Sequence, residues 1–446
     1  MKIKTIEVEN FKNIDCARVE FRNNLSGIYG PNGTGKTAII EATEILSKYF
    51  DIRKPQQISN ELKNKIAFLI KEGRKDCQIA VEFEDEEVEY KIVVKFGKDK
   101  LGIVYTIKEE LLKREKEKRR RYRSLVSIVN DETTIVPEIY FNNKNIDDKL
   151  KKAVYEANSL NFKELYQEFN NFNSLLGILL KLYMELKELP DFFTKVLEEF
   201  LKVSKILNMI LVITLKDQAY YNLDLLIPLS VHNEKLHGML VVNYKQGGSI
   251  YDEEIALEIE KIIKQMNNIF QIIVPNSTLD LDKKVERLED GNKKIGIKIL
   301  VKREGIDKAL PLERESTGII KLVSLLSALI YFVQDKNAIV LVDELDIHIF
   351  EYLLANFLEK LAIYAKGQLI FTGHNLFLLE KLNKDSIIIS TKQNEKIIYT
   401  YLKNVSKTTN LRQKYIRSQG LWIEDNIEPL FLNNSALEMF IRDLVI

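Results

Sequence analysis

The residues with the most specific chemistry are the eight from Gly30 to Thr37, which read G-P-N-G-T-G-K-T. They match the phosphate-binding loop G-x-x-x-x-G-K-[ST], whose glycines let the backbone turn tightly and present N–H groups to an anion. In this pattern Lys36 reaches the β- and γ-phosphates, and the Thr37 hydroxyl ligates Mg²⁺. The sequence therefore predicts a nucleotide site whose binding residues are Asn32, Gly33, Thr34, Gly35, Lys36 and Thr37.

A second group of reactive side chains follows the apolar run 337–342, which ends in Asp343 and Glu344. A near-continuous apolar run indicates a strand of a parallel sheet that is covered on both faces. Ligands of such sheets bind beyond the carboxyl ends of the strands, so the two acids are expected beside the phosphate loop. Asp343 would then hold Mg²⁺, and Glu344 would polarise the attacking water.

Two shorter segments add candidates to this site. His374 follows the predicted strand 368–371, where an imidazole can donate a hydrogen bond to the γ-phosphate or to the water. Ser316 and Gly318 precede an apolar helix, 319–332, for which Ser316 is a suitable N-cap. The N-terminus of that helix is either a second anion site or simply a capped helix terminus.

The elements that must position these residues can be recognised from their spacing. The apolar strand 25–29 precedes the phosphate loop, and the segment 38–46 after it has helical periodicity. Residues 78–84 and 88–96 alternate around an acidic turn and predict a β-hairpin. From 147 to about 207 the pattern is helical, and it is nearly free of Gly and Pro.

Composition excludes several other classes of protein. The 446 residues contain 66 Lys and Arg against 65 Asp and Glu, so contact with nucleic acid would need a local basic patch. Only Cys16 and Cys77 are present, which argues against a disulfide framework or a cysteine-based zinc site. No uncharged apolar run is long enough for a membrane span, and there is no signal-peptide pattern. We therefore expect a cytoplasmic protein that has no membrane partner.

The densest run of charge lies at 107–123 and includes K-R-E-K-E-K-R-R-R. One interpretation is a nucleic-acid-binding patch. The other is a solvated helix or loop tip that is held by internal ion pairs. The sequence does not decide between them.

The motifs together resemble the ABC-type ATPases of the SMC/RecF/OLD superfamily. More narrowly, they resemble the AAA-15/AAA-21 and AbiLi-like ATPases of antiphage defence. Residues 6–14 are similar to the opening strand and N-F-K/R segment of that family. Ser316 to Gly318 stand at its reduced S-x-G signature, Asp346 at its D-loop and His374 at its switch histidine. The resemblance covers roughly 1–145 and 276–446.

The resemblance implies an α/β fold. This is an ABC-ATPase head with a mixed phosphate-loop sheet, helices and an antiparallel β-subdomain, split by a mainly helical insertion. The expected divisions are 1–146 for the N-terminal lobe, 147–275 for the insertion, and 276–446 for the C-terminal lobe. ATP and Mg²⁺ are the implied cofactors. Two heads would form a homodimer in which Ser316 and Gly318 of one subunit complete the nucleotide site of the other.

The chain departs from the family pattern in three places. The loop after Glu344 lacks the usual L-H-P, Gly373 stands where Thr is common, and Asn142 and Asn143 lie where a Q-loop glutamine is expected. No D-x-D follows His374, and the four histidines lack metal-ligand spacing, so we expect any nuclease to be a separate protein.

The function that the resemblance implies is that of an ATP-hydrolysing subunit of an abortive-infection system, which controls a separate nuclease or toxin. The alternative is a RecF- or SMC-like DNA-repair ATPase that binds DNA directly. The role of the predicted insertion, either dimerisation or effector binding, stays open.

Overall fold

The computed structural model describes residues 1–51, 59–117, 121–129, 191–214, 226–232, 237–244, 248–287, 293–402 and 410–420. The predicted Q-loop region at 142–143 and the helical pattern at 147–190 lie outside them.

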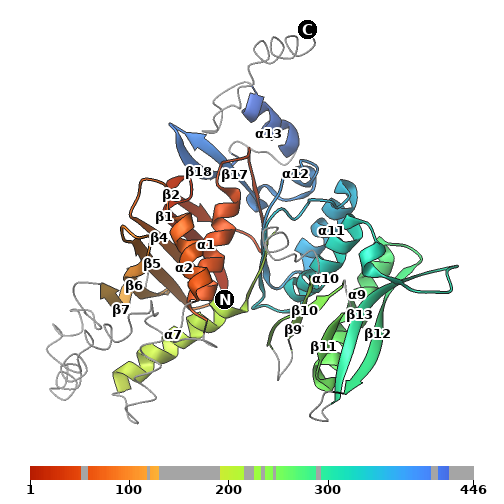
Figure 1. Cartoon of the computed structure of the whole chain (residues 1–446). Coiled ribbons are helices and arrows are strands. Elements are labelled where there is room, and N and C mark those ends of the chain that lie inside the picture. Colours follow the sequence, from red (N-terminus) through yellow and green to blue (C-terminus); the bar gives the residue numbers. More distant parts are fainter. Residues whose placement is uncertain are drawn as a thin grey trace, which may run out of the picture.

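A six-stranded sheet with the order β18-β17-β3-β16-β15-β8 forms the centre of the molecule (Figure 1). Neighbouring strands are parallel except for β18, which pairs antiparallel with β17. All residues of β3, β15 and β16 are buried, as expected for parallel strands covered on both faces. The strands are β3 (Leu25–Tyr29), β8 (Ile210–Ile213), β15 (Ile339–Val342), β16 (Gln368–Thr372), β17 (Ile387–Gln393) and β18 (Lys396–Tyr401).

Side chains of β15 alternate between two cores on opposite faces of this sheet. Ile339 and Leu341 pack with the buried face of α1 (Lys36–Tyr49). Val340 and Val342 pack on the other face with α10 (Thr317–Gln334), α11 (Glu351–Tyr364) and α12 (Leu378–Lys381). The predicted loop helix and both strands of the predicted nucleotide site are therefore confirmed.

A second, antiparallel sheet with the order β2-β1-β4-β5-β6-β7 covers the outer side of α1. It contains the predicted hairpin, because β4 pairs with β5. The fold class predicted from the sequence, a phosphate-loop sheet with helices plus an antiparallel β-subdomain, is confirmed. The strands are β1 (Lys2–Phe11), β2 (Ile14–Glu20), β4 (Asp76–Glu84), β5 (Val88–Lys98), β6 (Val104–Glu115) and β7 (Arg123–Val129).

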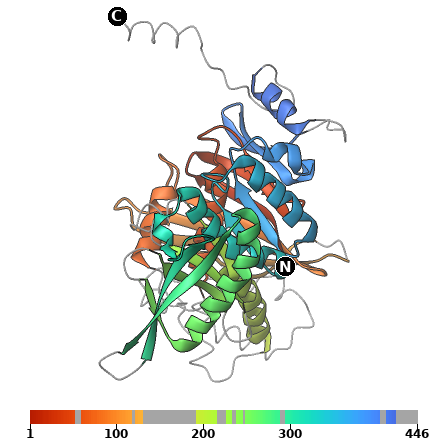
Figure 2. The same ribbon diagram turned by 90° about the vertical axis from the view of Figure 1, so that its right-hand side faces the viewer.

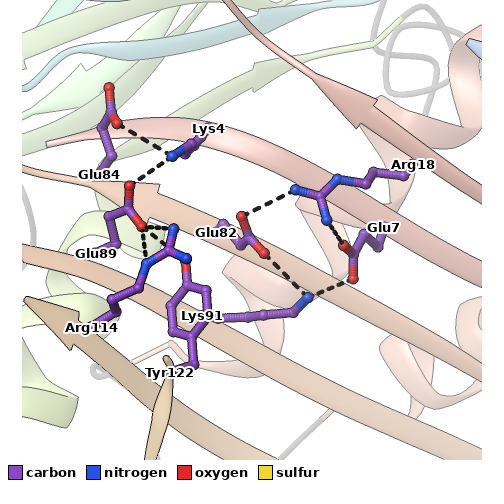
Figure 3. Close-up of polar contacts among 9 residues, drawn as sticks. All are labelled: Lys4, Glu7, Arg18, Glu82, Glu84, Glu89, Lys91, Arg114 and Tyr122. Atoms are coloured by element: carbon purple, nitrogen blue, oxygen red, sulfur yellow. Dashed lines mark hydrogen bonds and ion pairs between the residues drawn. The ribbon is translucent and has the colours of Figure 1, made fainter. Parts of the chain in front are cut away.

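Alternating charges cross one face of this second sheet from strand to strand (Figure 3). Glu89, the second residue of β5, accepts hydrogen bonds from Lys4 Nζ at 2.7 Å and Arg114 Nε at 2.7 Å. Lys91 Nζ lies 2.6 Å from Glu7 and 3.2 Å from Glu82. Cross-strand pairs of opposite charge stabilise a sheet, so this charged face holds strands from distant parts of the chain together.

The described residues of the charge-dense stretch at 107–123 are not helical. The nucleic-acid interpretation stays a prediction, because residues 118–120 lie outside the described residues. Most of its first half is strand β6, and the described remainder is a turn and the start of β7. Lys113 pairs with Glu199 at 3.2 Å, and Arg114 pairs with Glu89. These two cations therefore neutralise buried or half-buried acids of the same chain.

A third unit packs on α10 at the side of the molecule away from the second sheet (Figures 1 and 2). The long helix α9 (Glu253–Ile273) lies against the hairpin of β12 (Ser277–Arg287) and β13 (Lys293–Arg303). Two short strands, β11 (Ser249–Tyr251) and β14 (Leu310–Pro311), extend this sheet. A second hairpin, β9 (Leu226–His232) and β10 (His237–Asn243), packs on α10, where Ser327 Oγ donates to Pro228 O at 2.9 Å.

The expected boundaries of the insertion need a correction. Strand β8 lies within 147–275, yet it pairs with β15 in the central sheet, and α7 (Asp191–Met209) packs on α1. The described part of the segment also contains strands β9 to β11. Apolar periodicity could not reveal this, because an edge strand of the head and a strand of an insertion have the same local pattern.

Helices α2 and α13 pack against the two cores of the central sheet. α2 (Asn60–Leu69) begins at Ser59, whose side chain accepts the Leu62 N–H at 3.1 Å. α13 (Leu411–Gly420) buries Leu411 and Tyr415 against the central core. By length and composition alone α10 could cross a membrane, but 61% of it is buried inside the protein.

The charged network at Glu89 gives a test of the fold. Burial raises the pKa of the Glu89 carboxyl, but the hydrogen bonds from Lys4 and Arg114 outweigh it, so the pKa is lowered overall. A carboxyl of this kind stabilises the fold above its unfolded pKa of about 4.3, and the contribution is lost as the pH falls through the folded value. We expect Glu89→Gln to cost about 1–3 kcal/mol at pH 7 and less near pH 3, measured by thermal melting across pH.

Glu84→Gln is the matched control, because Glu84 pairs with Lys4 and Lys116 on the same sheet but its side chain is 41% exposed. Its expected cost is within about 0.5 kcal/mol, as for surface ion pairs. Equal effects of the two substitutions would contradict the role given to Glu89.

Candidate functional site

The phosphate loop, residues 30–37, joins the end of β3 to the start of α1, as predicted from the sequence. Asn32 and Gly33 are exposed at its tip, whereas Thr34 is buried and its hydroxyl donates to Pro31 O at 2.8 Å. Gly33 and Gly35 have φ angles of 79° and 86°, in the left-handed region that favours glycine. A Cβ at Gly35 would also lie 2.8 Å from the Tyr399 hydroxyl oxygen.

Three side chains that sequence reasoning did not single out hold this loop from behind. Tyr399 donates its hydroxyl to Gly35 O at 2.8 Å. Ser390 donates to Thr34 O, and Asn13 donates to Gly33 O. They come from β18, β17 and the β1–β2 turn, so no local pattern in the sequence connects them with residues 30–37.

Lys36 is buried within the loop that it closes. Its Nζ donates to Gly30 O at 2.8 Å and to Pro31 O at 3.0 Å. Burial lowers the pKa of Lys36, and the nearby carboxylates of Glu344, Asp343 and Asp346 oppose that effect. The predicted binding lysine and the predicted acids therefore share one electrostatic environment, although about 300 residues separate them in the sequence.

Asp343 connects the phosphate loop with the end of β15. It is 4% exposed, and its Oδ1 accepts hydrogen bonds from Thr37 Oγ1 at 3.0 Å and from Thr372 Oγ1 at 2.6 Å. Hydroxyl and carboxylate oxygens are the ligands that Mg²⁺ prefers. Thr37 and Asp343, the two predicted metal ligands, are thus adjacent and of the right chemistry for this ion.

Glu344 follows in a left-handed backbone conformation, with φ 51°. Its N–H donates to Thr372 Oγ1 at 2.7 Å, so the Thr372 hydroxyl joins both acids. Left-handed conformations of residues other than glycine cost about 1 kcal/mol or more and are found where function or packing fixes the turn. The last residue of β16, Thr372, lies directly before Gly373 and His374, and this position is the signal that could have identified it.

Asp346 fixes the backbone of the predicted switch histidine. Its Oδ2 accepts the N–H groups of His374, at 2.6 Å, and of Asn375. His374 itself is exposed. A Cβ at position 373 would lie 3.2 Å from Asp346 Oδ2, a tight contact with the carboxylate that holds His374.

The signature segment lies against the loop that follows Glu344. Ser316 caps α10 by accepting the Ile319 N–H at 3.4 Å, as the sequence predicted. A Cβ at Gly318 would lie 2.5 Å from the backbone oxygen of His348, so only glycine permits this approach. Within the described part of the chain, Ser316 and Gly318 form no hydrogen bond with residues 30–37.

Comparison with known proteins identifies a family for this chain. Residues 1–379 match the model of the AAA ATPase domain, AAA_15. Two short matches are to the DNA replication and repair protein RecF of Francisella tularensis subsp. novicida (strain U112) and subsp. tularensis (strain SCHU S4 / Schu 4). Each is 38% identical over 56 residues, which is 13% of this chain and 16% of RecF.

Solved structures similar to this chain include SMC head domains. One, bound to the C-winged helix domain of ScpA, has 14% identity, a TM-score of 0.47, and coverage of 90% of this chain and 98% of that one. Another, from Pyrococcus furiosus, has 16% identity, a TM-score of 0.43, and coverage of 90% and 96%.

The family model covers most of the chain, including residues 30–37, the acids at 343–344 and His374. From this match, the protein belongs to the AAA ATPase domain family.

Proposed function

We propose that this protein hydrolyses ATP with Mg²⁺ at the site formed by residues 30–37, Asp343 and Glu344. The observation that carries the proposal is the pair of hydrogen bonds on Asp343 Oδ1, because they bring Thr37 of the phosphate loop and the acid-bearing turn into contact. A phosphate loop that stood alone would be compatible with many kinases and GTPases.

Each residue of the site has a role that fits its surroundings. Asn32 to Gly35 present backbone N–H groups, and Lys36 neutralises the transferred phosphate. Thr37 and Asp343 would hold Mg²⁺, which supplies charge neutralisation at the phosphates when it is bound. Glu344 is half-buried and would orient the attacking water, while His374 would hydrogen-bond to the γ-phosphate.

We further propose that two copies of the chain close over the nucleotide. Ser316 is exposed at the start of α10, where it and Gly318 offer a second anion site. Phe350 and Tyr352 lie just beyond the same loop and are 72% and 60% exposed. Large apolar side chains next to an exposed helix terminus are typical of a surface that a partner covers, and a second copy also supplies the opposite half of the site.

The physiological role that we propose is the control of a separate effector, a nuclease or toxin, in an abortive-infection system. It is supported by the resemblance of the motifs to antiphage ATPases and by membership of the AAA ATPase domain family. The second candidate, direct DNA binding in repair, is favoured by the short RecF matches. The internal ion pairs of Lys113 and Arg114 weigh against it.

The first prediction from the proposed function concerns the two halves of the site. We expect Lys36→Ala to lose ATP binding, because the cation for the phosphates is removed. Glu344→Gln is expected to keep binding but to lower kcat about 10²–10⁴-fold, and to remain dimeric with ATP in light scattering. Hydrolysis by Glu344→Gln at the wild-type rate would show that the base has been assigned to the wrong residue.

The second prediction concerns Thr372, whose hydroxyl joins Asp343 and Glu344. Thr372→Val keeps the shape of the side chain but leaves the Glu344 N–H without its acceptor. We expect kcat to fall about 10–100-fold, which corresponds to the loss of one buried hydrogen-bonding group. Thr372→Ser restores the hydroxyl and should recover most of the rate, and failure of that rescue would point to packing instead.

The third prediction separates the two physiological roles. In cells that carry the gene with its neighbouring genes, the wild-type protein should reduce phage plating, whereas Lys36→Ala and Glu344→Gln should not. A DNA-repair role predicts the reverse pattern: no effect on plating, together with duplex binding that weakens steeply with salt. Flat binding curves at low salt would remove the second role.

A further inference from the structure

Lys321 is a buried charged residue to which the proposed reaction gives no role. It lies on α10, one turn beyond Ser316, and is 5% exposed. Its Nζ has no hydrogen-bond partner among the described residues. Lysine is almost never fully buried unless it is paired, and an unpaired buried ammonium carries a large cost. A buried, unpaired Lys321 therefore needs a functional explanation.

The charges around Lys321 are those of the candidate site. Burial lowers the pKa of the Lys321 ammonium, and the carboxylates of Asp343, Glu344 and Asp346 oppose that effect. The same three carboxylates act on Lys36. Two cations, from α1 on one face of the central sheet and from α10 on the other, thus share one set of acids.

The segment carrying these acids also contains an unpaired buried acceptor. Asp346 Oδ1 has no hydrogen-bond partner among the described residues, although Oδ2 holds the N–H groups of His374 and Asn375. The first turn of α10 contacts this segment directly, since Gly318 leaves no space for a Cβ against His348 O. An unpaired donor and an unpaired acceptor therefore belong to two elements in contact.

We propose that Lys321 is a positioning residue for the acid-bearing loop of its own chain, residues 343–348. In the arrangement that hydrolyses ATP, its ammonium pairs with Asp346 Oδ1 and so fixes Glu344 and, through Asp346, His374. Ser316 and Gly318 lie on the same helix as Lys321. Helix α10 would therefore both face the partner's nucleotide and fix the position of the acids in its own chain. This inference rests on the proposed ATPase function and, for the link between subunits, on the proposed dimer.

Lys321→Met tests the role of the ammonium, because methionine replaces the stem and removes the charge. We expect binding of a fluorescent ATP analogue and the KM for ATP to change less than about twofold, while kcat falls about 10–100-fold, as for misplaced catalytic groups. Removal of an unpaired buried charge should leave the melting temperature equal or higher. Lower activity without lower stability distinguishes positioning from a purely structural role.

Two further variants keep this result interpretable. Ser324→Ala changes the same buried face of α10, where Ser324 Oγ donates to Lys321 O at 2.7 Å, and should leave kcat unchanged. Lys321→Arg retains a cation and should recover part of kcat. A wild-type kcat for Lys321→Met would overturn the inference, as would an equal loss in Ser324→Ala. Absence of hydrolysis by the wild-type protein would instead refute the proposed function.

Mixed dimers locate the effect. When Lys36→Ala is paired with Lys321→Met, the one working site uses the acids of the Lys321→Met chain, and we expect the low rate. When wild type is paired with a chain that carries both substitutions, the working site uses wild-type acids, and we expect the rate of a wild-type/Lys36→Ala dimer. A low rate in the second pairing would place Lys321 on the partner's site and overturn the assignment. A monomer that still hydrolyses ATP would refute the dimer alone.

Discussion

The rest of the site depends on the hydrogen bonding of one buried carboxylate. Asp343 Oδ1 accepts from Thr37, at the start of α1, and from Thr372, at the end of β16. Three segments that are distant in the sequence meet at this atom, because β3, β15 and β16 are parallel and end at the same edge of the central sheet. The positions of Lys36, Glu344 and His374, which directly follow these strands or the phosphate loop, depend on that register.

Different kinds of side chain hold the segments on either side of this carboxylate. Polar side chains from both sheets hold the phosphate loop through its backbone oxygens, so the loop itself keeps its N–H groups for an anion. On the other side, Asp346 holds the backbone of His374 and Asn375. Lysines on both faces of the central sheet, Lys36 on one and Lys321 on the other, interact electrostatically with the carboxylates of this segment.

The protein contains almost equal numbers of acidic and basic residues, and the second sheet shows where some of these charges pair. Among the described residues, several of its cations are paired across strands, as Lys91 is with Glu7 and Glu82, so this charge stabilises the sheet. A charge-dense stretch in the sequence, such as 107–123, is consistent with paired charges or with a basic patch. Only the partners of each side chain distinguish them, and those partners lie up to 86 residues away, as for Lys113 and Glu199.

The sequence by itself determined the phosphate loop, its flanking strand and helix, the acids at 343–344 and the cap at Ser316, because each depends on local spacing and local backbone requirements. It could not determine that Asn13, Ser390 and Tyr399 support the loop, that Thr372 joins the acids, or that β8 belongs to the central sheet. These contacts depend on strand register and on helix packing between distant segments. Lys321 shows the difference most clearly. In the sequence it is a single charge in an apolar helix, and only the tertiary structure brings it within the electrostatic influence of three carboxylates.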